Sequence, residues 1–142
     1  MKKLLPRLLC CAVLLALVVS SGCDSTPVRV ARTTLVVPLS PDHPSTPVDI
    51  EVVTDITVEI PAPPAGSDLI WEIVSNNTKV LDQTTPLKPK APAVAGESPA
   101  WSVTFYSLRP GKSVLRFVLV HPNEAEATPV AKCALSVRVN DD

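Results

Sequence analysis

The sequence predicts an all-β protein, an immunoglobulin-like sandwich of two sheets with about seven antiparallel strands. Three observations predict it. From residue 48 onward, most segments alternate apolar and polar residues with a period of two, as half-buried strands do. These segments are short, are separated by loops that contain proline or glycine, and lack a helical repeat. Finally, Trp71 falls on the third segment, where immunoglobulin-like domains carry a core tryptophan.

The N-terminus has the charge and hydropathy pattern of a secretory signal peptide. Basic residues at positions 2, 3 and 7 precede an apolar run, residues 8–19, that is too short to cross a bilayer comfortably. The run ends in Ser-Ser-Gly-Cys at residues 20–23, which resembles the lipobox of bacterial lipoproteins. The resemblance implies that residues 1–22 are removed and that Cys23 becomes the lipidated first residue. The alternative is ordinary secretion, in which Cys23 carries no lipid.

A lipid on Cys23 would determine where the protein is located. Several acyl chains, such as palmitate, make a stable membrane anchor, so we expect a cell-envelope protein that faces the periplasm or the exterior. Asp24 resembles an inner-membrane retention signal of some bacteria, and the choice between inner and outer membrane stays open. Cys10 and Cys11 leave with the signal, so Cys133 is the one other cysteine and the mature chain has no intrachain disulfide.

Charge and motif content exclude several functions. Without residues 1–22 the chain has 10 basic and 14 acidic side chains, a net charge of about −4. This balance argues against nucleic acid as a partner and against adhesion to anionic lipid through a basic patch. His43 and His121 lack companion ligands at metal-binding spacing, and no nucleophile motif is present. We therefore expect no metal, no cofactor and no catalytic activity.

The first half of the chain predicts a spacer followed by four strands. Residues 23–45 read as a lipid-anchored, proline-rich spacer with a candidate edge strand at residues 28–37, and the sandwich is predicted over residues 46–142. Two alternating strands meet at a turn at Thr54–Asp55, and a third strand carries Trp71. The four predicted strands are residues 48–52, 56–60, 69–74 and 78–83.

The second half predicts three longer strands, residues 101–107, 114–121 and 131–139, with a turn at residues 109–113. Trp101 lies near Pro99 and is the tryptophan more open to solvent. The inner faces of these strands are predicted to contribute Trp101, Val103 and Phe105, then Leu115, Phe117 and Leu119, and finally Cys133, Leu135, Val137 and Val139.

Strand reversal places three long loops at one end of the predicted sandwich. If every strand reverses direction, the loops at residues 61–68, 86–99 and 121–129 lie together, and tight turns occupy the other end. Long loops on a rigid sandwich are where binding surfaces are built. The candidate binding residues are Pro64, Gly66, Asp68 and Leu69 in the first loop, Gly96 and Glu97 in the second, and His121, Pro122 and Asn123 in the third.

Residues 46–139 resemble the chagasin-type inhibitors of papain-like cysteine peptidases, which have an immunoglobulin-like fold. The matching stretches are "VDIEVVTDITVEIP" (48–61), "LIW" (69–71), Gly96 before an aromatic strand, and "GKSVLRFVLVHP" (111–122). The resemblance implies that the three loops enter a peptidase cleft.

The departures from the family fall on those loops. The family's first loop has an Asn-Pro-Thr-Thr-Gly-aromatic run, whereas this chain lacks the asparagine and both threonines. Here Leu69 replaces the aromatic residue, Asp68 replaces the glycine, and Gly66 comes two residues early. Residues 121–123, His-Pro-Asn, stand where the family has an Arg-Pro-Trp-like run.

Two functions follow from these observations. The first is a non-enzymatic envelope lipoprotein, held at the membrane by lipid on Cys23, whose loops bind a protein partner that the sequence does not name. The alternative is a chagasin-like inhibitor of cysteine peptidases. The replaced loop residues favour the first, because a shared fold does not transfer a function.

Overall fold

The computed structural model describes residues 32–124 and 128–141. The predicted signal segment, Cys23 and residues 24–31 of the predicted spacer lie outside the described residues. Within these limits the chain forms strands and turns. No helix there is long and apolar enough to cross a membrane.

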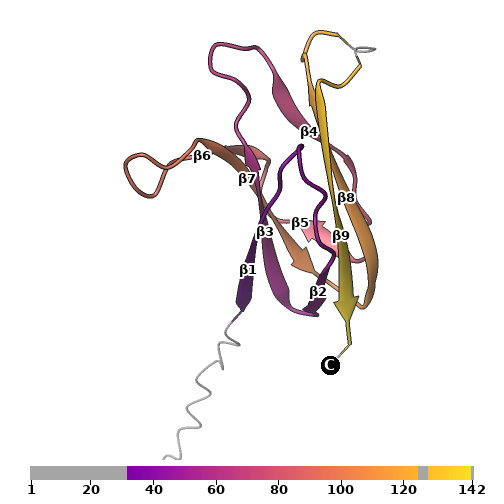
Figure 1. Ribbon diagram of the computed structural model, residues 1–142. Helices are drawn as coiled ribbons and strands as arrows, with labels where there is room; N and C mark the ends of the chain where they lie inside the picture. Colours follow the sequence, from indigo (N-terminus) through magenta and orange to yellow (C-terminus); the bar gives the residue numbers. More distant parts are fainter. Residues whose placement is uncertain (1–31, 125–127, 142) are drawn as a thin grey trace, which may run out of the picture. The chain divides into compact units, whose positions relative to one another are not determined.

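Nine strands in the described part of the chain form two sheets (Figure 1). This confirms the predicted immunoglobulin-like sandwich. The first sheet has the order β1 (Thr33–Pro38), β3 (Thr54–Pro61), β7 (Ala100–Ser107), with β5 (Leu81–Gln83) and β6 (Lys88–Lys90) paired one after the other along the free edge of β7. The second sheet has the order β2 (Val48–Glu51), β9 (Ala131–Asn140), β8 (Gly111–Val120), β4 (Ile70–Ser75).

Two strand pairs are parallel, which corrects the expectation that all strands are antiparallel. β1 runs parallel to β3 and β2 runs parallel to β9, whereas the other pairs are antiparallel. The cause is the path of the chain. β2 follows β1 into the opposite sheet, and a tight turn at Val52–Val53 returns the chain to the first sheet as β3. The chain therefore enters the first sheet twice in the same direction.

Part of the predicted spacer belongs to the sandwich. β1 overlaps the candidate edge strand, residues 28–37, and lies at the edge of the first sheet. Just beyond it, Leu39 is buried and its backbone N–H donates to the carbonyl of Glu59 at 2.7 Å. The first sheet thus takes its edge strand from residues before position 46.

The core lies between the inner faces of the two sheets. The longer strands contribute the inward residues that the alternation predicts. Trp101 is less buried than Trp71, as predicted, whereas Cys133 is only partly buried and not enclosed in the core as expected. Cys133 lies on the part of β9 that β2 does not reach, since β2 pairs only with residues 137–140. The fully enclosed residues include Ile56, Val58, Ile60, Val103, Phe105, Leu115, Phe117 and Leu135.

Several predicted boundaries are wrong. The turn expected at residues 109–113 is shorter, because β8 already begins at Gly111. The turn expected at Thr54–Asp55 lies at Val52–Val53. The fourth strand begins at Leu81 instead of residue 78, because the carbonyl of Asn77 accepts hydrogen bonds from the N–H groups of Val80 and Leu81 and closes a turn there. The short strand β6 lies inside the predicted loop at residues 86–99; its Pro89 is tolerated because β6 is an edge strand.

Val53 has a strained backbone, which gives a first testable prediction. Its φ of 65° is left-handed, a conformation that costs an L-residue about 1–2 kcal/mol and that branched side chains rarely adopt. Glycine removes this cost but loses about 0.5–1 kcal/mol of chain entropy on folding. We therefore expect Val53→Gly to leave the free energy of unfolding unchanged or to raise it by up to about 1 kcal/mol.

The matched control is Val52→Gly, in the same turn. Val52 packs against the core, so its loss is expected to lower stability by about 1 kcal/mol or more. Urea denaturation of both variants checks the contrast. Equal destabilisation at the two positions would contradict the assigned backbone strain.

Candidate functional site

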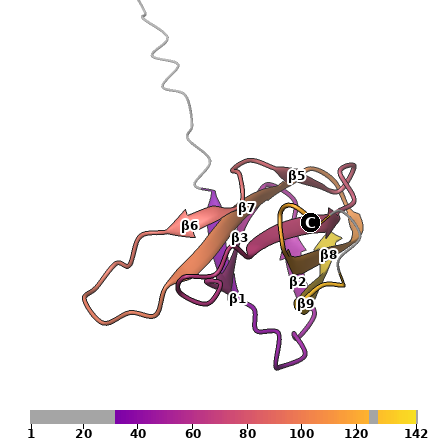
Figure 2. The ribbon, with the colours of Figure 1, turned by 90° about the horizontal axis from the view of Figure 1, so that it is seen from above.

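The strand register places the bases of three loops at one end of the sandwich, although the β6–β7 loop extends away from the other two (Figures 1 and 2). The end of β3 pairs with the start of β7 through Pro61 and Ala100. In the other sheet, the start of β4 pairs with the end of β8 through Ile70 and Val120. The β3–β4 loop (residues 62–69) is therefore flanked by the β6–β7 loop (91–99) on one side and the β8–β9 loop (121–130) on the other. In Figure 1 the β6–β7 loop projects to the side of the sandwich.

Two contacts hold these loops to one another. The backbone N–H of Ala62 donates to the carbonyl of Pro99 at 3.0 Å, joining the first and second loops. His121 Nδ1 and Asp68 Oδ1 lie 2.9 Å apart and join the first and third loops. A pair this exposed contributes little to stability. Its consequence is positional, because two candidate residues far apart in sequence are fixed side by side.

The first loop has an exposed turn on an anchored base. Trp71 Nε1 donates to the carbonyl of Pro61 at 2.8 Å, and Leu69 packs partly against the core, so both hold the base. At the tip, the N–H and hydroxyl of Ser67 both donate to the carbonyl of Pro64. Gly66 takes a φ of +79° in this turn, and nothing lies within 4 Å of where its Cβ would be. The tip therefore leaves bare backbone open to a partner.

The second loop is organised by Glu97. Its carboxylate accepts a 2.6 Å hydrogen bond from the N–H of Ala93, and its own N–H donates to the carbonyl of Val94, with Gly96 at a φ of +90° between them. The hydrogen bond from Ala93, with help from Lys90, lowers the pKa of Glu97. This contact therefore stabilises the loop at neutral pH and is lost as the pH falls through the folded pKa. Glu97 thus shapes the loop from within.

The third loop presents the remaining candidate residues. His121 is half-buried, whereas Pro122 and Asn123 are exposed, and a backbone hydrogen bond from Glu124 to His121 closes a turn around them. Of the three candidates, His121 contacts the first loop through Asp68, and Pro122 and Asn123 follow it in the exposed turn.

Comparison with known proteins gives a match in fold. No protein-family model matches the sequence, and no curated protein matches it. The crystal structure of a cysteine protease inhibitor from Entamoeba histolytica has a TM-score of 0.59 at 15% identity, and the match covers 75% of this chain and 97% of that one. The fold is chagasin-like. The solution structure of amebosin matches with a TM-score of 0.51 at 18% identity, over 75% of this chain and 98% of that one.

One feature of this chagasin-like sandwich, an exposed valine, was not singled out from the sequence of the loops. Val94, at the tip of the second loop, has 70% of its surface exposed, the largest fraction among the exposed large hydrophobic residues in the described part of the chain. Val130, in the third loop, is also exposed. The available signal was a branched apolar residue in an otherwise small-residue loop, Ala-Val-Ala-Gly at 93–96. Single exposed apolar residues are common on protein surfaces. Val94 is a candidate contact for a partner because it lies at the tip of a long loop.

The described residues of the chagasin-like sandwich offer little for chemistry. They contain no group of three or more His, Cys, Asp or Glu side chains that could hold a metal ion. Burial raises the pKa of the Cys133 thiol to about 11, so it stays protonated near neutral pH and is a poor nucleophile. His121 is engaged with Asp68. What the loop end offers is a shaped surface.

Proposed function

We propose that this protein is a non-enzymatic binding domain of the cell envelope and that its three-loop end captures a cysteine peptidase. The observation that carries the proposal is that three loops begin beside one another and are in contact through the Asp68–His121 pair and the Ala62–Pro99 hydrogen bond. Loops that are fixed before binding lose less conformational entropy when a partner docks. The chagasin-like fold, which a cysteine protease inhibitor shares, supports the class of partner.

Inhibition by such a surface requires no reaction. The exposed backbone at Gly66 and Gly96 would approach the walls of a cleft closely, because neither position has a side chain. Val94 would add an apolar contact at the rim of the same surface. The bound loops would then exclude substrate and water from the peptidase.

The replaced loop residues imply contacts with a peptidase that differ from those of the family that the sequence resembles. Asp68 is occupied by His121, and Leu69 is turned toward the core. Asp68 and Leu69 are therefore not available for the contacts that the family makes with its glycine and its aromatic residue at these positions. We therefore propose that Pro64, Gly66 and Val94 contribute most of the contact.

Substitution of Val94 tests this proposal. Val94→Asp places a charge where an apolar contact is proposed, and we expect the inhibition constant against papain to rise at least about tenfold, about 1.4 kcal/mol of binding. The matched control is Leu108→Asp, because Leu108 is an exposed apolar residue in the β7–β8 turn at the opposite end. The control is expected to inhibit like the unmodified protein.

The result for the unmodified protein separates the two functions. Inhibition in the micromolar range or tighter, more than about 8 kcal/mol of binding, supports the peptidase partner. No inhibition at about 100 µM, well above that range, would contradict it. Co-purification from detergent-solubilised membranes, with the Val94→Asp variant as the comparison, would then identify another protein partner for the same loop end.

The envelope location is proposed from the N-terminal sequence. The charged start, the short apolar run and the small residues before Cys23 support export and lipid attachment.

A further inference from the structure

The outer face of the second sheet carries a cluster of cations, here called the basic face. Lys112 and Arg116 are exposed on β8, and Lys132 and Arg138 are exposed on β9. The alternation of these strands directs all four side chains away from the core. The outward positions between them are Val114, Val118, Ala134 and Ser136, so neither strand contributes an acid to this face.

Three acids on the edge strands share this side of the sheet with the four cations, whereas the two central strands carry cations and no acid. Lys112 lies directly opposite Arg138 in the β8–β9 register, an arrangement of like charges that is unfavourable for a sheet. Arg138 has a partner in Asp49, whose Oδ1 lies 3.7 Å from Nε. No other ion pair of the basic face occurs among the described residues. The acids on this side of the sheet lie on its edge strands: Asp49 and Glu51 on β2 and Glu72 on β4.

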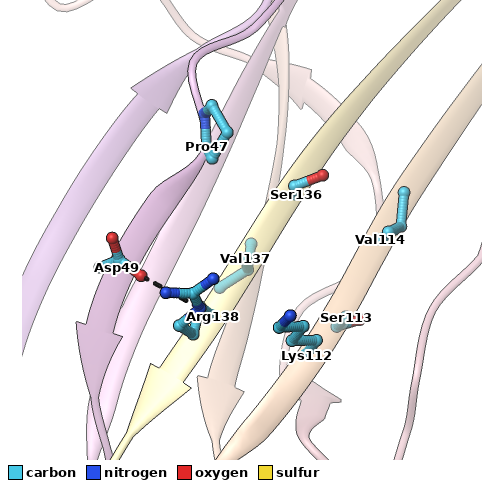
Figure 3. A pocket seen from close by; sticks show the side chains of 8 residues that line it. All are labelled: Pro47, Asp49, Lys112, Ser113, Val114, Ser136, Val137 and Arg138. Atoms are coloured by element: carbon cyan, nitrogen blue, oxygen red, sulfur yellow. Dashed lines mark ion pairs between the residues drawn. The ribbon is translucent and has the colours of Figure 1, made fainter.

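Shallow hollows lie between the cations. One, of about 280 Å³, is lined by residues that include Lys112, Ser136 and Arg138 and also the acid Asp49 (Figure 3). In that view Arg138 reaches toward Asp49, and Lys112 lies beside it on the neighbouring strand. A second hollow, of about 430 Å³, is lined by Arg116, Val118, Lys132 and Ala134, together with Val74 of β4. Val74 is 55% exposed, so this hollow combines cations with apolar surface.

We propose that the basic face binds the anionic headgroup surface of a phospholipid bilayer. Its two central strands carry cations and no acid, and each Lys or Arg near an anionic headgroup surface favours binding. The face is one side of a sheet with shallow hollows, a shape that suits an extended, nearly planar partner better than a narrow one. This differs from the expectation that the net charge of about −4 excludes a basic patch. Net charge does not show how charges are distributed, and no acid of the described chain lies on the two central strands of this sheet.

The proposed lipid on Cys23 would strengthen this contact. Residues 24–32 separate Cys23 from β1, and a chain reaches at most about 3.5 Å per residue, roughly 35 Å in all. A lipid there would keep the sandwich within that distance of the bilayer and raise its effective concentration at the surface. This step rests on the proposed envelope location, whereas the binding of the basic face to headgroups does not.

Vesicle binding of the chain from Asp24 onward tests the proposal without lipid on the protein. Every buried core residue in the described part of the chain lies between Leu39 and Val139, so this chain keeps that core. We expect it to co-sediment with vesicles of phosphatidylcholine containing about 30% phosphatidylglycerol, to ignore pure phosphatidylcholine vesicles, and to dissociate at about 0.5 M salt, where screening is strong.

Two double variants with the same net charge distinguish binding through the basic face from a general effect of net charge. Arg116→Glu with Lys132→Glu is expected to weaken binding at least about 25-fold, about fivefold for each cation lost. Lys79→Glu with Lys88→Glu changes two exposed lysines elsewhere and is expected to bind within a few-fold of the unmodified chain. Thermal unfolding checks that both variants fold, and Arg116→Gln with Lys132→Gln replaces the first if it does not.

Three results would overturn the inference. These are equal binding to both kinds of vesicle, equal loss in the two double variants, and no vesicle binding. Retention on immobilised polyglutamate that depends on Arg116 and Lys132, without vesicle binding, would assign the face to a soluble acidic protein instead. Peptidase inhibition by the Arg116 and Lys132 variant is expected to be unchanged, because these residues lie outside the three loops. The two proposals therefore fail independently.

Discussion

Replacing Phe117 with alanine is expected to lower the free energy of unfolding by about 3–5 kcal/mol, the usual cost of truncating a large core side chain. Phe117 is fully buried in the middle of β8, between Ile73 of β4 and Cys133 of β9 in the second sheet. Both neighbours are fixed by strand pairing, so the cavity left by the ring cannot close easily. Urea denaturation measures the loss.

Arg116→Ala is the matched control on the adjacent residue. Arg116 is exposed on the outer face of the same strand, and we expect its replacement to change stability by less than about 0.5 kcal/mol. Small and equal effects at residues 116 and 117 would contradict the register of β8, because a one-residue slip exchanges the two faces of a strand.

Cys23→Ala is expected to abolish both lipid attachment and processing of the precursor. The lipobox resemblance makes one residue responsible for both, since the cysteine that carries the lipid also marks the first residue of the mature chain. In a bacterial host, the unmodified protein should incorporate a palmitate analogue and appear at the mass of a lipidated chain that begins at Cys23. The variant should keep residues 1–22 and remain unlabelled.

The control for this experiment is Cys133→Ala. Cys133 is a partly buried thiol on β9, so its replacement should leave labelling and cleavage intact. A Cys23→Ala protein that is still cleaved, together with an unmodified protein that carries no lipid by intact mass spectrometry, would contradict the anchor.

The sandwich could be predicted because period-two alternation specifies which side of a strand is apolar. Ile56, Val58 and Ile60 face the core, as their spacing predicts. Alternation does not specify which strand lies next to which, however. The parallel pairs β1–β3 and β2–β9 arise because the chain changes sheets at Val52–Val53, and the change leaves no local pattern. β6 escaped prediction because Lys-Pro-Lys has no apolar alternation.

The loop grouping was accessible from the sequence for a related reason. The strands beside the three loops pair in antiparallel fashion: β3 with β7, β4 with β8, and β8 with β9. Strand reversal therefore predicts that the bases of the loops lie at the same end. It does not predict that the β6–β7 loop projects to the side (Figure 1). The roles of single side chains were not accessible. Asp68 meets His121 across the gap between two loops, and Leu69 turns toward the core. Such contacts depend on tertiary neighbours that loop sequence does not reveal.

The pairing of β2 with β9 also constrains how the chain can fold. β2 has one partner strand in its sheet, and that partner, β9, is formed by residues 131–140. A chain that emerges from a ribosome or a secretion channel N-terminus first cannot complete the second sheet until β9 has emerged. Contacts this distant in sequence also close slowly. The same topology therefore delays completion of the second sheet until almost all of the chain has emerged, whereas the first sheet ends at Ser107 and can form earlier.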